Sequence, residues 1–237
     1  AAGYHWPGEN LRDTLIALPG LLLATDRYDE ARNSLKLCAQ LVNQGMLPDS
    51  PPNEDETSQY NCLDTSLWFF VATYRYMTVT GDEALVRDEL LPVLRDIISW
   101  HEIGTRRGLR MDSDGLLSIA PSDTPVTWMN GYADGQATTP RHGKIVEVNA
   151  LWHNALVIVS ELCLRFGHTY DARDYRRTSD RVKTSFQQVF WNKDLGCLYD
   201  FVDGEVRDAS IRPNQIFALS LPIPLLISSR ARNVLKV

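Results

Sequence analysis

One segment of this chain, Thr127–Glu147 (TWMNGYADGQATTPRHGKIVE), combines the composition of a loop with side chains that can bind a ligand. Its glycines and proline interrupt any helical or strand period. A loop this long inside a compact domain is usually functional or disordered, and the aromatic content argues against disorder. Proteins bind neutral, hydroxyl-rich ligands such as sugars with an aromatic ring, an arginine and carboxylates. This loop supplies them as Trp128, Arg141, Asp134 and Glu147. The alternative is an ordered surface loop with incidental charges.

Individual residues of this loop allow more than one interpretation. The indole of Trp128 is either a platform on which the C–H face of a sugar stacks or a part of the core. Arg141 and Glu147 flank a turn, so they either form an ion pair buried under the loop or contact the sugar directly. Asn130 is suited to holding a turn before Gly131.

The bulk composition is that of an ordinary soluble globular protein. The 237 residues are 44% hydrophobic and 23% charged, and one or two domains are typical of this length. A net charge of −6 and a pI near 5.4 argue against nucleic acid or an anionic membrane as a partner. No apolar run approaches the roughly 20 residues that a membrane span needs.

The cysteines and the N-terminus indicate the compartment. Cys38, Cys62, Cys163 and Cys197 lie far apart, without a CxxC pair or a histidine at metal-ligand spacing. We therefore expect no metal, no cofactor and a reduced, cytoplasmic setting. The N-terminal segment AAGYHWPGEN lacks the features of a signal peptide.

Apolar periodicity predicts helices separated by polar loops. The predicted helices span Arg12–Ala24, Tyr28–Asn43, Asp64–Thr80, Asp82–His101, Val146–Phe166, Tyr170–Trp191, Asn214–Leu221 and Ser228–Lys236. Pro19–Gly20 predicts a kink near the middle of the first helix. Two segments punctuated by Gly and Asp, Gly108–Ser118 and Gly196–Asp203, predict β-hairpins.

Long polar loops alternate with tight connections along the chain. The long loops precede Arg12 or span Pro51–Leu63, Thr127–Ile145 and Glu205–Pro213. Such alternation predicts helical hairpins with every second loop at one end, as in an α/α barrel or toroid with a site at its mouth. A helical repeat is the alternative, but no fixed period is visible. Six residues should gather at this mouth: Asp13, Asp64, Trp128, Arg141, Glu147 and Arg212.

Several motifs, taken in order along the chain, resemble the glucosidase region of glycogen debranching enzymes. They are AGYHW with RDTLIALPGLLL, RYDEAR, YNCLDTSLWF, TWMN with TTPRHGKIVEVNALWHNAL, and LYDFVDG with IRPNQIFALSLP. The resemblance covers essentially all 237 residues, and this coverage makes it strong where one motif would be weak.

The resemblance implies an (α/α)6 barrel, a single domain over residues 1–237, and hydrolysis of α-1,6-linked glucose at a branch stub with inversion. An inverting glycosidase needs one carboxyl group to protonate the leaving oxygen and another to activate water, roughly 6.5–9.5 Å apart. The implied ligand is an α-glucan or malto-oligosaccharide.

The same resemblance suggests which residues bind the substrate. They are Arg12, Asp13, Tyr60, Asp64, Trp128, Arg141, Glu147, Arg212, Asn214 and Gln215. Simpler roles exist for some of them. Asp13 at a helix start is favourable to the helix dipole, and Asp64 could be an N-cap.

The chain departs from the family pattern at the catalytic positions. The family's acid is the Asp of its TWMD segment, which is Asn130 here, and its base is a Glu on a later segment. Asp134 is a candidate substitute acid. Because the sequence stops at Val237, before that segment, we expect a partial barrel that does not hydrolyse glucan and self-associates through its exposed apolar edge.

Three functions compete. The first is a debranching-type α-1,6-glucosidase, which the pocket motifs favour. The second is a non-catalytic glucan-binding protein, which Asn130 favours for this chain. The third is a related α/α-barrel glycosidase such as a trehalase-like enzyme.

Overall fold

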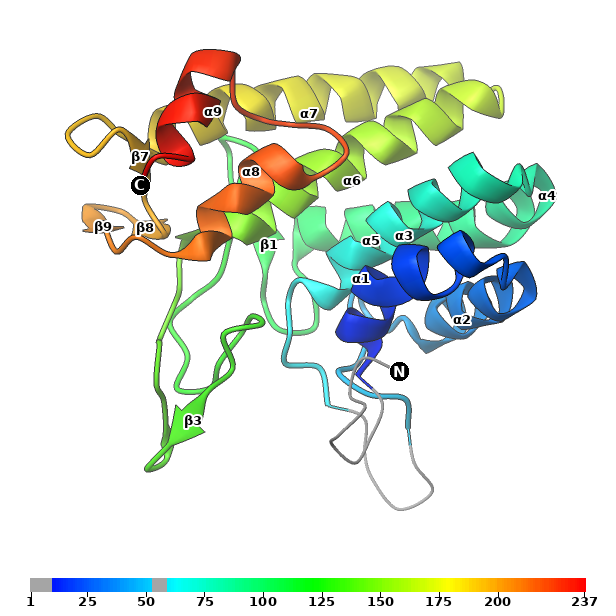
Figure 1. Cartoon of the computed structure of the whole chain (residues 1–237), viewed down its shortest axis with the longest axis horizontal. Helices are drawn as coiled ribbons and strands as arrows, with labels where there is room; N and C mark the ends of the chain where they lie inside the picture. Colours follow the sequence, from blue (N-terminus) through cyan, green and yellow to red (C-terminus); the bar gives the residue numbers. More distant parts are fainter. Residues whose placement is uncertain (1–9, 53–58) are drawn as a thin grey trace.

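Helices form most of this protein, whose computed structural model describes residues 10–52 and 59–237 (Figure 1). The longest antiparallel pair is α6 (Val146–Arg165) and α7 (Thr169–Val189), joined at Gly167. The other helical elements are α1 (Leu11–Leu21), η1 (Leu23–Thr25), α2 (Tyr28–Leu41), α3 (Thr65–Thr80), α4 (Glu83–Leu85), η2 (Val86–Leu90), α5 (Leu91–Ile103), η3 (Pro213–Ile216), α8 (Phe217–Ser220) and α9 (Ser228–Val234). This helix-rich architecture with short strands is what the periodicity predicts.

The helices pack in two rows. In one row α1, α3, α6 and α8 lie side by side, because α3 packs against both α1 and α6, and α6 packs against α8. Behind them, α2 packs on α3 and on η2, α5 packs on α6, and α7 runs along α6 (Figure 1). The first row therefore brings together the beginnings of helices that are far apart in sequence.

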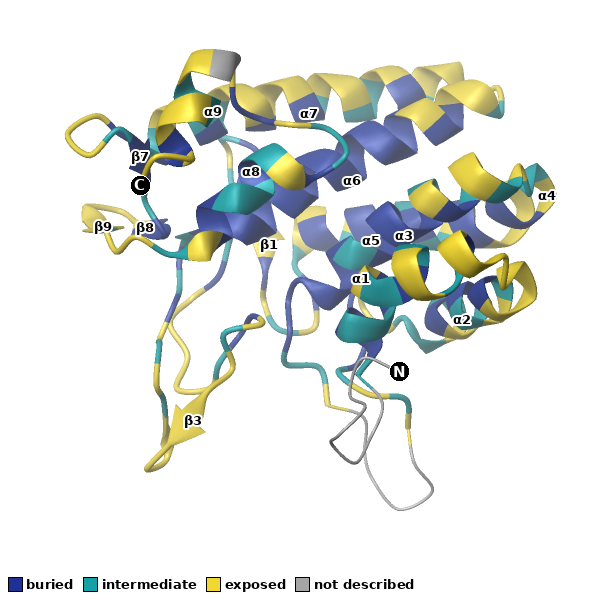
Figure 2. Ribbon diagram, in the orientation of Figure 1, coloured by how far each residue is buried: buried dark blue, intermediate teal, exposed yellow. Residues whose placement is uncertain are grey.

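The contrast between α6 and α7 shows how the sequence sets these rows. Almost every side chain of α6 is buried, including Trp152, which has no exposed surface (Figure 2). Only Ala172, Ser179, Val182 and Phe186 are buried in α7, at the spacing of a single helical stripe. Thus α6 is a central helix, and α7 covers it with one apolar face.

The predicted helices agree with the structure except in detail. The first ends at Leu21 rather than Ala24, so Pro19–Gly20 lies in its last turn and not near its middle. The fourth contains the π-helical turn η2, in which the N–H of Leu91 donates to the carbonyl oxygen of Val86. The turn ends two residues before Pro92, which has no N–H to continue the α-helical pattern.

One of the two predicted hairpins is confirmed and one is wrong. Within Gly108–Ser118, β1 (Arg110–Met111) pairs with β2 (Leu117–Ser118). The predicted hairpin at Gly196–Asp203 instead contributes one strand to each of two hairpins. Its β7 (Cys197–Leu198) pairs with β6 (Trp191–Asn192), and its β8 (Phe201–Asp203) pairs with β9 (Val206–Asp208). Gly196 and Gly204, at φ of 68° and 56°, make the two turns.

The segment Thr127–Glu147 is more ordered than its composition predicts. It contains a hairpin of β3 (Tyr132–Ala133) and β4 (Gln136–Ala137), then β5 (Lys144–Ile145), which pairs with β8. Gly143 stands next to β5 with φ of 62°, and a Cβ there would lie 2.5 Å from the carbonyl oxygen of Val202. A glycine is therefore needed for the loop to approach β8.

The described loops place the starts of α1, α3, α6 and η3 at one end of the molecule (Figure 1). The AGYHW motif and part of the Pro51–Leu63 loop lie outside the described residues. None of the helices in the described ranges has both the length and the apolar character that crossing a bilayer requires.

Candidate active site

A pocket opens where the start of α1 meets η3, α8 and the residues that precede α3. Its cavity of about 420 Å³ is lined by the carboxylates of Asp13 and Asp64 and by the indole of Trp128. The remaining wall is mostly apolar and includes Trp68 and Phe217, whose rings meet edge to face at 5.7 Å. A concave apolar site with a few convergent polar groups is typical of small-molecule binding.

Asp64 is the most unusual group in this pocket. It occupies the N-cap position of α3 but makes no side-chain capping bond, so the simple capping role is not the one it has. The residue is 2% exposed, and its Oδ1 has no hydrogen-bond partner in the part of the chain that the structure describes. Burial raises the pKa of Asp64 to about 7, Arg12 opposes this rise, and Glu147 adds to it. The carboxyl group is therefore partly protonated near neutral pH.

Arg12 supplies the positive charge beside Asp64. Its Nη1 donates to Sγ of Cys62 at 3.6 Å, and its Nε donates to Oδ1 of Asp13 at 3.2 Å. Asn10 caps α1 by accepting from the backbone N–H of Asp13 at 3.0 Å. The turn at the start of α1 thus fixes both the arginine and one pocket carboxylate.

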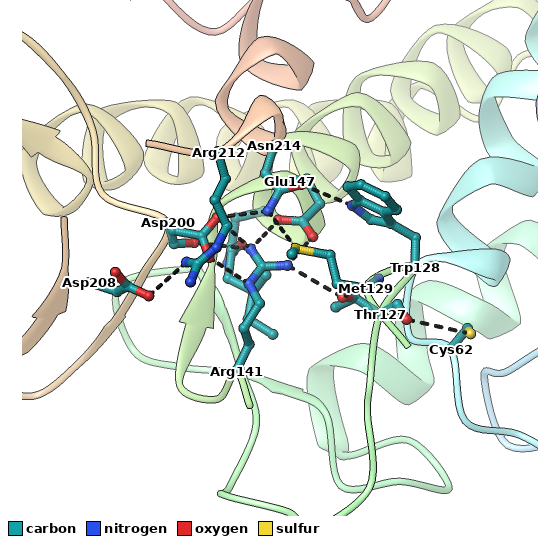
Figure 3. Close-up of polar contacts among 12 residues, drawn as sticks. Cys62, Thr127, Trp128, Met129, Arg141, Glu147, Asp200, Asp208, Arg212 and Asn214 are labelled. Carbon is teal, nitrogen blue, oxygen red and sulfur yellow. Dashed lines mark hydrogen bonds and ion pairs between the residues drawn. The ribbon is translucent and has the colours of Figure 1, made fainter. Parts of the chain in front are cut away.

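A cluster of buried charges centred on Arg141 lies next to the pocket (Figure 3). Nη1 and Nη2 of Arg141 donate to the two carboxylate oxygens of Glu147, the second bond at 2.6 Å. Nε of Arg141 lies 2.7 Å from Oδ2 of Asp200. The structure therefore has the buried ion pair, one of the two alternatives open from sequence. Because the side chains of Arg141 and Glu147 are each 1% exposed, contact with a sugar would require the cluster to open.

The motif at the start of η3 joins the same cluster. Nη1 of Arg212 donates to Oδ2 of Asp200 and to Oδ2 of Asp208, both at 2.7 Å. Nδ2 of Asn214 donates to Oδ1 of Asp200 at 2.7 Å. The neighbouring Gln215 has a different role, since its Oε1 accepts from the backbone N–H of Leu198 at 3.2 Å.

Trp128 connects the cluster to the pocket. Its Nε1 donates to Oδ1 of Asn214 at 2.9 Å, while the residue remains 37% exposed (Figure 3). Trp128 is therefore part of the pocket wall and not of the core. All six residues expected at the mouth lie at this end of the molecule, either in the pocket or in the adjoining cluster.

Three candidate residues lie elsewhere. Asn130 is exposed, and Asp134 is exposed in the turn between β3 and β4 with φ of 50°. An Asp followed by Gly135 in such a turn is typical of tight hairpins, which gives Asp134 a structural explanation. The ring of Tyr60 packs under the guanidinium of Arg106, 4.7 Å away. The described lining of the pocket includes none of the three.

Residues that sequence reasoning missed hold the site together. Asp200 is 3% exposed and contacts Arg141, Arg212 and Asn214. The only sequence signal was its place in LYDFVDG, as a charged residue between apolar strand residues. Asp49 was missed as well, and its carboxylate accepts from the backbone N–H of Cys62 at 2.9 Å.

The arrangement can bind a neutral polyol. The carboxylates of Asp13 and Asp64 can accept hydrogen bonds from hydroxyl groups, and Trp128 offers an aromatic face. Among the described residues, no group of three His, Cys, Asp or Glu side chains could hold a metal ion.

Comparisons with known proteins match this chain to a glycosidase family model and to a curated relative. The family model described as amylo-alpha-1,6-glucosidase matches residues 1–237. Glycogen debranching enzyme of Saccharomyces cerevisiae is 26% identical to this chain, and the match covers 64% of this chain and 13% of the yeast protein. The chain thus corresponds to a small part of that relative.

Solved structures with a similar fold include two rhamnosidases. The rhamnosidase from Klebsiella oxytoca with rhamnose bound has a TM-score of 0.65 and 19% identity, over 95% of this chain and 40% of that one. The GH78 family rhamnosidase of Bacillus sp. GL1 has a TM-score of 0.68 and 17% identity, over 95% and 22% respectively. At these identities the likeness is evidence for the fold alone.

Proposed function

Since the amylo-α-1,6-glucosidase family matches residues 1–237, this chain belongs to that family, and we propose that its pocket binds the terminal glucose of an α-1,6 branch on an α-glucan. The observation that carries the proposal is the pocket itself. Two carboxylates, Asp13 and Asp64, and the partly exposed indole of Trp128 meet in a cavity of about 420 Å³ with a largely apolar wall.

The chemistry of such a site is inverting hydrolysis. One carboxyl group protonates the leaving oxygen, and a second, across the sugar ring, removes a proton from the attacking water. Water then attacks the anomeric carbon from the opposite face, so that α-linked glucose leaves as β-glucose. In the pocket, Asp64 has a pKa raised by burial, so its carboxyl group can accept a hydrogen bond from a ligand hydroxyl or, when protonated, donate one.

In this chain the site binds without cleaving. By its resemblance to the family motif, position 130 carries the acid, and it is an asparagine here. Asn130 is exposed on the loop two residues beyond Trp128, at the rim of the site and outside the described pocket lining. A carboxamide can hydrogen-bond to the glycosidic oxygen but cannot give up a proton at this step. Asn130 therefore also supports a second candidate function, a non-catalytic glucan-binding protein that keeps the pocket of its hydrolase relatives.

We further propose that the helical rows are part of an (α/α)6 barrel with the pocket at its mouth. Supporting this, the starts of α1, α3, α6 and η3 converge at the pocket or the adjoining cluster. The positive ends of the α1 and α3 dipoles face the site, where carboxylates and hydroxyl oxygens are favourable.

Calorimetric titration with malto-oligosaccharides tests the proposal. Unmodified chain should bind, and Trp128→Ala should lower the affinity roughly tenfold, because it removes the aromatic face. The matched control is Trp191→Ala, which removes a tryptophan that packs on Arg230 at 4.7 Å and lies outside the pocket. Equal effects of the two variants, or no binding by unmodified chain, would contradict the proposed function.

A further inference from the structure

We propose that Asn214, held by Asp200, is a positioning residue that fixes the indole of Trp128 at the wall of the pocket. The geometric part of this inference stands on the contacts of these residues alone. Its consequence for ligand affinity rests on the proposed function.

The side-chain amide of Asn214 is oriented by its two partners. Nδ2 donates to Oδ1 of Asp200 at 2.7 Å, and Oδ1 accepts from Nε1 of Trp128 at 2.9 Å (Figure 3). A carboxylate only accepts hydrogen bonds and an indole only donates one, so exchanging the amide oxygen and nitrogen would break both contacts. Asn214 is 0% exposed, so no water competes for these positions.

Asp200 is in turn held from two sides. Nη2 of Arg141 donates to its Oδ1 at 3.1 Å, and Nη1 of Arg212 donates to its Oδ2 at 2.7 Å. Bonds to a charged acceptor are shorter and stronger than bonds between neutral groups. The buried arginines therefore hold Asp200, Asp200 holds Asn214, and Asn214 holds Trp128.

Neighbouring contacts tie the rest of this loop segment to the same cluster. Nη1 of Arg141 donates to Oγ1 of Thr127, and Nδ2 of Asn214 contacts Sδ of Met129, both at 3.3 Å. Three consecutive residues, Thr127 to Met129, thus contact residues of the cluster.

This anchoring has a consequence for binding. Trp128 is 37% exposed on a loop that continues into Gly131, where an unanchored indole would sample several rotamers. A ring already held in one orientation loses less freedom when a ligand stacks on it. The Asn214 contact should therefore contribute to affinity although Asn214 itself is buried.

The test replaces Asn214 by leucine, which has a similar size and no hydrogen-bonding group. In ¹H–¹⁵N spectra the indole N–H resonance of Trp128 is identified by its loss in Trp128→Phe. Asn214→Leu should shift this resonance and speed its exchange with solvent at least tenfold. The matched control is Asn154→Leu. Asn154 is 1% exposed, and its Nδ2 donates to the carbonyl oxygens of Ala150 and Ile223 rather than to any partner of Trp128 or Asn214.

Affinity for malto-oligosaccharide gives the second readout. Asn214→Leu should weaken binding roughly tenfold, and it should cause no further loss in a Trp128→Phe background. An unchanged Trp128 resonance in Asn214→Leu would overturn the inference. An equal loss of affinity in both backgrounds would overturn it as well.

If Asn214→Leu fails to fold, hydrogen exchange in the unmodified chain still tests the inference. The Trp128 indole proton should exchange much more slowly than that of a free indole despite the exposed ring, and exchange at the free rate would refute the anchoring. If the resonance behaves as expected but no malto-oligosaccharide binds, the proposed function fails and the positioning role stands.

Discussion

Nε of Arg141 lies 2.7 Å from Oδ2 of Asp200, although the residues are 59 positions apart and their side chains are only 1% and 2% exposed. The same carboxylate also holds Arg212 and Asn214. A buried ion pair contributes little net stability, but removing one partner leaves an uncompensated buried charge. Asp200 is thus a residue on which both the fold and the site depend.

Asp200→Ala should lower the free energy of unfolding by about 3–5 kcal/mol, because it leaves Arg141 without one of its carboxylates. Urea denaturation measures the loss. The control is Glu83→Ala, which breaks an ion pair with Arg165 on the surface, where the side chains are 45% and 54% exposed. That change should cost less than about 1 kcal/mol, and equal losses would contradict the assignment.

Asp64→Asn should stabilise the fold above pH 7 while it weakens ligand binding. Burial raises the pKa of Asp64 from 3.8 to about 7, so the folded chain holds this proton more tightly than the unfolded chain. The stability that this proton gives is present below pH 3.8 and is lost as the pH rises through 7. The variant should gain up to about 4 kcal/mol at pH 8 relative to wild type.

The comparison is made by urea denaturation of both chains between pH 4 and 8. Their difference in unfolding free energy should grow with pH over this window. A constant difference would show that Asp64 ionises as an ordinary surface carboxylate.

Two buried histidines should make the protein sensitive to acid. Burial lowers the pKa of His101 and of His153 from 6.5 to about 4. Nδ1 of His101 donates to the carbonyl oxygen of Ile97 at 2.8 Å, so a second proton would go to the buried, unpartnered Nε2. The folded state disfavours protonation, and stability present above pH 6.5 is lost as the pH falls toward 4, by up to about 3 kcal/mol for each histidine.

His101→Gln should therefore flatten the dependence of the melting temperature on pH between 4 and 6.5. His168 is exposed beside the start of α7, and His168→Gln is the control. If neither substitution changes the slope of melting temperature against pH, the buried imidazoles do not cause the loss of stability in acid.

An apolar groove between α1, α3 and α8 should cause self-association. It encloses about 580 Å³ and is lined in part by Ile16 and Val79, which are 45% and 51% exposed. Exposed apolar surface of this kind favours association in water. Sedimentation should show mass increasing with concentration, and Ile16→Lys should reduce it. Tyr170→Lys, at a site 79% exposed on α7, should not.

The sequence was a good guide where the determining interactions are local. The apolar stripe of Ala172, Val182 and Phe186 defines α7 almost completely, because helical spacing follows from the backbone itself. By contrast, the strands at Cys197–Leu198 and Phe201–Asp203 were paired with each other incorrectly. Their partners lie on the far sides of the turns at Gly196 and Gly204, and local composition does not show which turn closes which hairpin.

The position of the candidate site could be predicted from the sequence, but the hydrogen bonds and ion pairs that hold it could not. Residues such as Asp13, Asp64 and Trp128 could be placed at one mouth from the alternation of loops. The role of Asp200 depends on contacts between distant segments, since its partner Arg141 is 59 positions away. Likewise, the raised pKa of Asp64 is a result of burial, which only the packed structure shows.

The most direct test of the account follows a malto-oligosaccharide with one α-1,6-linked glucose by NMR, in this chain and in any longer protein that contains it. Saturation transfer should show that the ligand binds, while no free β-glucose appears, because Asn130 cannot protonate the leaving oxygen. Where a base is present, Asn130→Asp should raise glucose release by at least about 10²-fold, and Asp134→Asn should change nothing. Release of β-glucose by the unmodified protein, with Asn130→Asp no faster, would contradict the account and make Asp134 the first residue to examine as the acid.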